Sequence, residues 1–183
     1  MQLRSLALTL AVLIGVDCTT WAANGTSTLT AQTSVAANCV VSTAFPTPSI
    51  VFGNYDPIAT NLNSDLTAAG SVIIDCVKGT TAVISLNFGT HAIGTQRYMV
   101  DPIASDSLKY DVYQPPSNAA GTACTFPGTI KWGDGTAPTS TLSTTSAPNK
   151  SDRQYYFCGT VPMGQNPSIG TNYADTITIT VSF

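Results

Sequence analysis

Two segments of this chain alternate cleanly between apolar and polar residues, one near each end. A period of two is typical of a β-strand that packs one face on a core and turns the other to water. In residues 176–183, Thr and Ser alternate with four apolar side chains, Ile177, Ile179, Val181 and Phe183. In residues 28–35, the face opposite the polar one carries Leu29, Ala31, Thr33 and Val35. We therefore expect a one-sided strand at each end of the chain.

Further short strands are expected between these two ends. Apolar or β-branched runs occupy residues 28–41, 71–75, 82–88, 108–113, 154–157 and 176–183. Between them lie stretches rich in Gly, Pro, Asn and Asp, which favour turns. Short strands with frequent turns indicate a β-sandwich. Residues 136–149 are low in complexity, which predicts a mobile surface loop. The chain has no internal repeat that would indicate a second domain.

The composition agrees with an all-β fold and is unfavourable for several functions. Only 9% of residues are charged, none is Glu, and 28 are Thr, so the usual residues of exposed helix faces are scarce. The net charge of −3 leaves no basic surface for a nucleic-acid partner. With His91 as the single histidine, His-based catalysis and two-His metal centres lack material. We expect a protein that is not an enzyme.

The first 23 residues read as a secretory signal peptide. Arg4 precedes an apolar run over residues 6–16, and small residues surround possible cleavage sites after Ala22 and Ala23. The run is shorter than the roughly 20 residues that a transmembrane helix needs. We expect export without membrane insertion, an N-terminal extension over residues 24–37 and one domain over residues 38–183.

Four cysteines follow the signal peptide: Cys39, Cys76, Cys124 and Cys158. In an exported β-rich chain, an even number indicates disulfides, and four cysteines allow three pairings. The pairing Cys39–Cys76 with Cys124–Cys158 is favoured because each bond would join neighbouring strand candidates. A zinc site is disfavoured because structural zinc sites use short paired spacings that these cysteines lack.

No catalytic, cofactor-binding or metal-binding residue is predicted. Asp134 stands between two glycines, but no calcium-type array of carboxylates follows it, so a tight turn is the better interpretation. His91 follows a predicted strand and is expected on a surface loop. A hydrolase would have to use His91 or an Asp, and the sequence has no GxSxG motif.

The strand at residues 176–183 raises the possibility of an incomplete sandwich. An immunoglobulin-like sandwich usually has about seven strands. If residues 176–183 form the penultimate strand, the sheet has an open edge beside a groove of uncovered core side chains, which proteins normally cover. A strand from another molecule could pair with this edge and fill the groove. The one-sided segment at residues 28–35 is a candidate donor, and donor and acceptor on one type of chain give a head-to-tail polymer.

Seven short motifs, in their order along the chain, resemble those of the spore coat protein U domain family. They are CVVS at 39–42, FGNYDP at 52–57, GSVIIDC at 70–76, LKYDVY at 108–113, WGDG at 132–135, GTVPMGQ at 159–165 and GTNYADT at 170–176. Each motif is weak alone, but the ordered set covers essentially the whole chain after the signal peptide. The family includes the major pilins of the archaic chaperone–usher pathway.

The resemblance implies an incomplete immunoglobulin-like β-sandwich that is completed by a donor strand from a neighbouring subunit. It implies a surface fibre for adhesion or biofilm, a periplasmic chaperone, an outer-membrane usher, no cofactor and a Cys39–Cys76 disulfide. Leu29, Ala31, Thr33 and Val35 would be the donor residues, and Ile177, Ile179, Val181 and Phe183 would border the acceptor groove and contact the chaperone. The alternative is a monomeric coat protein or tip adhesin that binds a surface or ligand directly.

Overall fold

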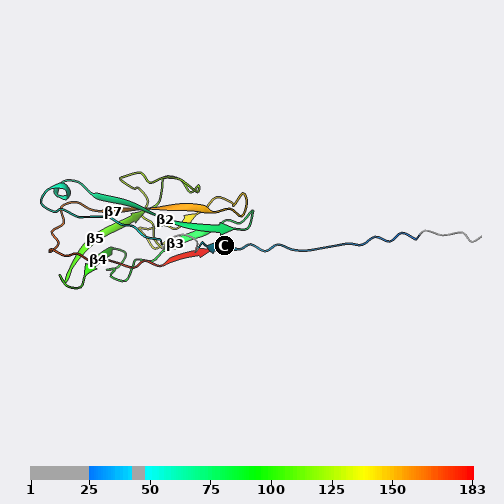
Figure 1. The fold of residues 1–183 in the computed structure, drawn as a ribbon, viewed down its shortest axis with the longest axis horizontal. Coiled ribbons are helices and arrows are strands. Elements are labelled where there is room, and N and C mark those ends of the chain that lie inside the picture. Colours follow the sequence, from blue (N-terminus) through cyan, green and yellow to red (C-terminus); the bar gives the residue numbers. More distant parts are fainter. Residues whose placement is uncertain (1–24, 43–47) are drawn as a thin grey trace, which may run out of the picture. The chain divides into compact units, whose positions relative to one another are not determined.

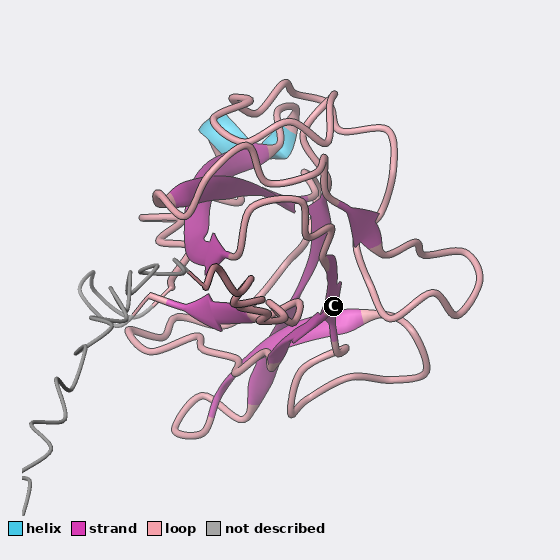
Figure 2. Cartoon of the chain, turned by 90° about the vertical axis from the view of Figure 1, so that its right-hand side faces the viewer, coloured by secondary structure: helices cyan, strands magenta, loops and turns pink. Residues whose placement is uncertain are grey.

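The computed structural model describes residues 25–42 and 48–183, so the signal-peptide prediction lies outside the described residues. The chain divides into two units, Met1–Ser34 and Val35–Phe183. The described part of the second unit contains eight strands and one short 3₁₀ helix, which confirms the all-β prediction (Figure 2). The elements are β1 (Cys39–Val41), η1 (Thr60–Leu62), β2 (Leu66–Cys76), β3 (Val83–Leu86), β4 (Arg97–Asp101), β5 (Asp106–Tyr113), β6 (Leu142–Ser143), β7 (Arg153–Val161) and β8 (Ile179–Ser182). Among the described residues, no helix has the length and apolar character needed to cross a membrane.

The strands form two antiparallel sheets. The larger sheet has the order β1-β2-β7-β5-β4, and the smaller has the order β6-β3-β8. The β2–β7 pair is the longest, with its register running from Leu66 opposite Val161 to Ile74 opposite Arg153. In Figure 1, β8 (red) lies along β3 and ends near the label of the C-terminus. The two sheets share one core, as expected for the predicted sandwich.

Side chains from both sheets form this core. Val72, Ile74, Val112 and Tyr155 come from the larger sheet, and Ile84 and Leu86 from the smaller. Trp132 is fully buried among the core residues, and its indole nitrogen donates a hydrogen bond to the Ile84 carbonyl at 2.9 Å. An indole therefore fills the interior without leaving its polar N–H unsatisfied.

The apolar runs located most of the long strands but missed some elements. Strand β4 was not expected, because polar residues occupy both ends of Arg97–Asp101. The first half of β2 was also missed, because Ala68, Ala69 and Gly70 have low strand propensity. Of the predicted run at residues 28–41, only Cys39–Val41 forms a strand.

The prediction of a mobile loop at residues 136–149 is wrong. Four side chains of this segment are buried: Thr139, Leu142, Thr144 and Ala147. The Thr144 amide donates to the Ala82 carbonyl at 2.8 Å, and the Thr144 hydroxyl accepts from the Ala82 amide at 2.9 Å. The Thr-rich composition resembles that of a loop, but threonine is β-branched and fits a packed, extended segment.

Two disulfides stabilise the larger sheet. Cys39 and Cys76 lie directly opposite each other in the β1–β2 pair and are bonded. Cys124, in the segment between β5 and β6, is bonded to Cys158 of β7. This is the pairing that the sequence favoured.

We expect the Cys124→Ser/Cys158→Ser double variant to unfold with a free energy lower by about 3–4 kcal/mol, because the unfolded chain gains the freedom that the closed loop denied it. The loop spans 34 residues. Urea denaturation followed by the fluorescence of Trp132 measures the change. A decrease in the free energy of unfolding of less than about 1 kcal/mol would contradict the view that this disulfide stabilises the fold by restricting the unfolded chain.

Candidate functional site: an apolar groove beside the last strand

A groove of about 420 Å³ opens between two extended segments of the sandwich, residues 48–52 and residues 173–179. Its floor consists of core side chains contributed by four strands: Leu86 of β3, Met99 of β4, Tyr110 and Val112 of β5, and Phe157 of β7. Met99 is half-buried and the other four side chains are at most 4% exposed, so the groove reaches down to the side chains of the core.

The first wall, residues 48–52, packs on the inner face of the larger sheet at two glycines. A Cβ atom at Gly70 would lie 2.1 Å from the Ser49 carbonyl oxygen, and one at Gly159 would lie 2.7 Å from the Phe52 ring. Any side chain at either glycine would displace this wall. Among the described residues, no backbone group of residues 48–53 forms a hydrogen bond, so this wall offers unpaired N–H and C=O groups.

The second wall, residues 173–179, crosses from one sheet to the other. Ala174 exchanges two backbone hydrogen bonds with Val100 of β4, at 3.2 and 2.9 Å. Further along, β8 pairs with β3. Ile177 and Ile179 line the groove between these attachments. The predicted alternation is present: Ile177, Ile179 and Val181 are half-buried, and the Thr and Ser residues between them are exposed.

Only one edge of β8 is paired among the described strands. The Asn87 amide donates to the Thr178 carbonyl at 3.1 Å, and Thr180 stands opposite Ser85 of β3. Backbone groups of successive residues in a strand point to opposite sides, so those of Ile177 and Ile179 point away from β3. In agreement, the Leu86 amide opposite Ile179 donates to Gly133 instead, at 3.1 Å.

The groove continues into a second hollow of about 690 Å³. Both hollows share Ile50, Phe52, Met99 and Tyr173, and the second extends to residues 167–171. Phe183 follows β8 and is 57% exposed, more than the three apolar residues that precede it on the predicted face. The structure thus places Ile177 and Ile179 at the groove, Val181 next along the same face, and Phe183 beyond the strand.

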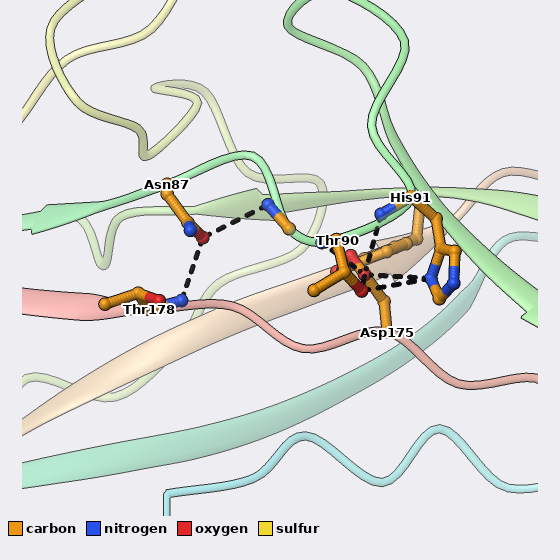
Figure 3. Close-up of polar contacts among 7 residues, drawn as sticks. Asn87, Thr90, His91, Asp175 and Thr178 are labelled. Atoms are coloured by element: carbon orange, nitrogen blue, oxygen red, sulfur yellow. Dashed lines mark hydrogen bonds and ion pairs between the residues drawn. The ribbon is translucent and has the colours of Figure 1, made fainter.

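A buried carboxylate fixes the wall at residues 173–179 (Figure 3). We define the Asp175 cluster as Asn87, Thr90, His91, Tyr110 and Asp175. The Tyr110 hydroxyl donates to Asp175 Oδ2 at 2.7 Å. Asp175 Oδ1 accepts from the Thr90 amide and hydroxyl, both at 2.9 Å, and lies 3.2 Å from His91 Nδ1. The Asp175 side chain is 1% exposed, so these partners take the place of water.

The hydrogen bonds in this cluster favour the ionised carboxylate. Burial alone would raise the pKa of Asp175, but the hydrogen bonds from Tyr110 and Thr90 outweigh it and hold the pKa below its ordinary value. Burial, reinforced by the hydrogen bond and charge of Asp175, raises the pKa of Tyr110, so this phenol stays a donor. The ionised Asp175 carboxylate is therefore stabilised by the hydroxyl groups of Tyr110 and Thr90 and by the Thr90 amide.

His91 and Asp134 agree with the modest roles expected of them. His91 is exposed, as expected of a surface loop, although its contact with Asp175 was not anticipated. Asp134 accepts a hydrogen bond from the Thr136 amide at 2.8 Å, which closes a tight turn. Within residues 25–42 and 48–183, no group of three or more His, Cys, Asp or Glu side chains could hold a metal ion.

Residues 25–38 form no strand. Leu29 is 96% exposed and Val35 is 79% exposed. The alternation at residues 28–35 therefore remains a property of the sequence, and its use as a donor strand remains a prediction.

Two sheets around one core, with an apolar groove beside β8, define a β-sandwich domain, and comparison with known proteins gives its family. The sequence matches the Spore Coat Protein U domain over residues 25–180. It is 31% identical over 170 residues to Protein U of Myxococcus xanthus, covering 88% of this chain and 87% of that protein. The chain belongs to the Spore Coat Protein U domain family, which confirms the resemblance seen in its motifs.

One solved structure is similar over much of the chain. It is the chaperone–tip adhesion subunit pre-assembly complex of the archaic chaperone–usher Csu pili of Acinetobacter baumannii. The similarity has a TM-score of 0.47 and 24% identity, and covers 81% of this chain. This chain spans 40% of the chain that it matches there.

If the Asp175 cluster acts as described, acid will weaken the domain in a way that depends on this residue. The pKa of Asp175 is lower in the folded state than the value of about 3.9 expected in the unfolded state. Its ionised form therefore stabilises the fold at a pH above about 3.9, and this stabilisation is lost as the pH falls through the pKa of the folded state. We expect Asp175→Asn to lower the free energy of unfolding by about 2 kcal/mol at pH 7. The difference from the parent protein narrows below about pH 4. Urea denaturation from pH 7 to pH 2 tests this prediction. A difference in the free energy of unfolding between Asp175→Asn and the parent protein that did not change with pH would contradict it.

Proposed function

We propose that this chain is a structural subunit of a chaperone–usher surface fibre and that its groove binds residues 28–35 of the next subunit. The polymer is head-to-tail because donor and acceptor lie on the same type of chain. The role is mechanical and requires no catalysis or cofactor. The fibre would serve adhesion or biofilm formation.

The observation that carries this proposal is the pairing of an apolar floor with two walls that have unpaired backbone groups. An apolar floor alone could bind many ligands. Among the described residues, the backbone groups of residues 48–53 and of the outer edge of β8 have no hydrogen-bond partner. Such groups favour an extended peptide as ligand, because a strand can pair with a strand edge along its length. The groove therefore fits a β-strand better than a compact small molecule.

The segment at residues 28–35 has the properties of the missing strand. Its donor face would enter the groove, while the residues of the opposite face remain in water: Thr28, Thr30, Gln32 and Ser34. Burial of Leu29 and Val35 contributes roughly 1.5–3 kcal/mol for each side chain, in addition to the backbone hydrogen bonds. Both side chains are largely exposed in the single chain, so almost all of that area is available for burial.

Assembly explains the partners that we propose. An open groove is a hazard before polymerisation, because an exposed edge pairs with any available strand. A periplasmic chaperone would supply a temporary strand against Ile177, Ile179 and Val181, with Phe183 at the end of the contact. Exchange for the better-fitting donor at an outer-membrane usher would then extend the fibre. Export would depend on residues 1–23.

A second candidate is a monomeric coat protein that fills the groove with its own extension. The description of the family as a spore coat domain and the 31% identity to Protein U favour considering it. The two functions differ in oligomeric state. A fibre subunit forms polymers, whereas a self-filled coat protein elutes from a sizing column as a monomer that no added donor peptide can enter.

A charge placed on the donor face tests the assignment. We expect Leu29→Asp to weaken subunit association by at least about 10-fold, because it replaces a buried apolar side chain with a carboxylate. Thr30→Asp is the matched control: it adds the same charge one residue away, on the face turned to water. Polymer length is measured by electron microscopy and by sizing after co-expression with the chaperone.

Deletion of residues 26–36 is the stricter version of this experiment. We expect the shortened chain to bind chaperone normally and to form no polymer. Fibres formed by the shortened chain would show that residues 28–35 are not the donor. A chaperone-independent monomer formed by the complete chain would favour the coat-protein alternative.

A further inference from the structure

Among the described residues, backbone hydrogen bonds join the groove wall at residues 173–179 to the β-sheets near its two ends. Ala174 is bonded to β4 of the larger sheet, and β8 is bonded to β3 of the smaller. Ile177, which lines the groove, lies between these attachments. The position of this part of the wall must therefore be set by other contacts.

Side chains of the Asp175 cluster provide these contacts from two directions. From below, β5 presents the Tyr110 hydroxyl to Asp175 Oδ2. From the side, the loop after β3 presents the Thr90 amide and hydroxyl to Asp175 Oδ1. The loop approaches so closely that a Cβ atom at Gly89 would overlap Asp175 Oδ2, at 1.9 Å. The carboxylate thus joins three elements that are far apart in the sequence.

The loop itself is held in place by a second set of bonds. The Asn87 side chain accepts from the Thr178 amide at 2.8 Å, just before β8 begins. The Asn87 carbonyl accepts from Arg97 Nη2 at 2.6 Å and from Arg97 Nε at 3.2 Å. Arg97 is 2% exposed and belongs to β4, so this series of contacts ends on a strand of the larger sheet.

We infer that the Asp175 cluster is a positioning device that holds the groove wall in its strand-accepting place before any strand enters. The identity of the incoming strand rests on the proposed function, but the positioning of the wall does not. A wall already in place does not have to be ordered during binding, and avoiding that ordering cost strengthens binding. Tyr110 connects the two roles, because its ring lies in the groove floor and its hydroxyl holds Asp175.

Tyr110→Phe is the decisive variant, because it keeps the ring and removes only the hydroxyl. Tyr156→Phe is the matched control: its hydroxyl donates one bond, to Gln154 at 3.1 Å on β7, and it does not line the groove. Amide hydrogen exchange is measured on the complete chain. We expect Tyr110→Phe to speed exchange at Thr90, Ala174 and Thr178 by at least about 10-fold, the loss expected for a hydrogen bond to a charged group. Exchange in the β2–β7 pair is expected to stay the same.

A second variant distinguishes loss of the Asp175 contacts from a general loss of stability. Thr90→Val removes one hydroxyl bond to Asp175 from an exposed residue outside the groove. It should increase exchange at Ala174 and Thr178 in the same direction. If neither variant differs from Tyr156→Phe at these amides, the inference is overturned.

Binding of a synthetic peptide with the sequence of residues 26–36 separates the inference from the proposed function. We expect its Kd to rise about 10-fold in Tyr110→Phe and to stay within twofold of the parent value in Tyr156→Phe. Faster exchange together with weaker peptide binding supports both ideas. Faster exchange with no peptide binding, even to the parent protein, supports the positioning role and refutes the donor assignment. Faster exchange with unchanged peptide affinity overturns the inference that the cluster prepares the groove.

Discussion

The backbone of a strand edge must form hydrogen bonds with something, and this requirement organises the groove side of the molecule. The N–H and C=O groups of Ile177 and Ile179 point away from β3, while residues 48–53 run nearby without backbone partners among the described residues. Water can satisfy these polar groups, but it solvates the half-buried apolar side chains of Met99, Ile177 and Ile179 poorly. An added strand would meet both needs at once, which is why the ligand that we propose for the groove is a strand.

The larger sheet is stabilised by contacts that lie away from the groove. The long β2–β7 pair, the two disulfides and buried Trp132 hold the larger sheet independently of the groove. Gly70 and Gly159 then let the wall at residues 48–52 approach that sheet closely. The glycines weaken strand propensity in the two longest strands, and the length of the ladder compensates for it.

The sequence predicted those features that depend on local pattern and missed those that depend on distant partners. Alternation located β8 and its packed face, and apolar runs located β3 and parts of β2, β5 and β7. The wall at residues 48–52 has no periodicity that distinguishes it from a loop, and its place depends on glycines 20 or more residues away. The Asp175 cluster could not be predicted from the sequence either, because Tyr110 and Thr90 are 65 and 85 residues from Asp175. The prediction for residues 136–149 was wrong for another reason: composition alone does not distinguish a packed Thr-rich segment from a mobile one.

The absence of charge around the groove bears on how pairing is controlled. Proteins commonly protect exposed strand edges with Lys or other charged side chains, which oppose pairing with another chain. Residues 176–183 and 48–52 contain none, and neither do residues 25–38. The nearest charge on the wall, Asp175, is buried and engaged by its own loop. If the proposed pairing takes place, no charged side chain in these three segments would oppose it, so the strand that occupies the groove would itself have to control which other strands can enter.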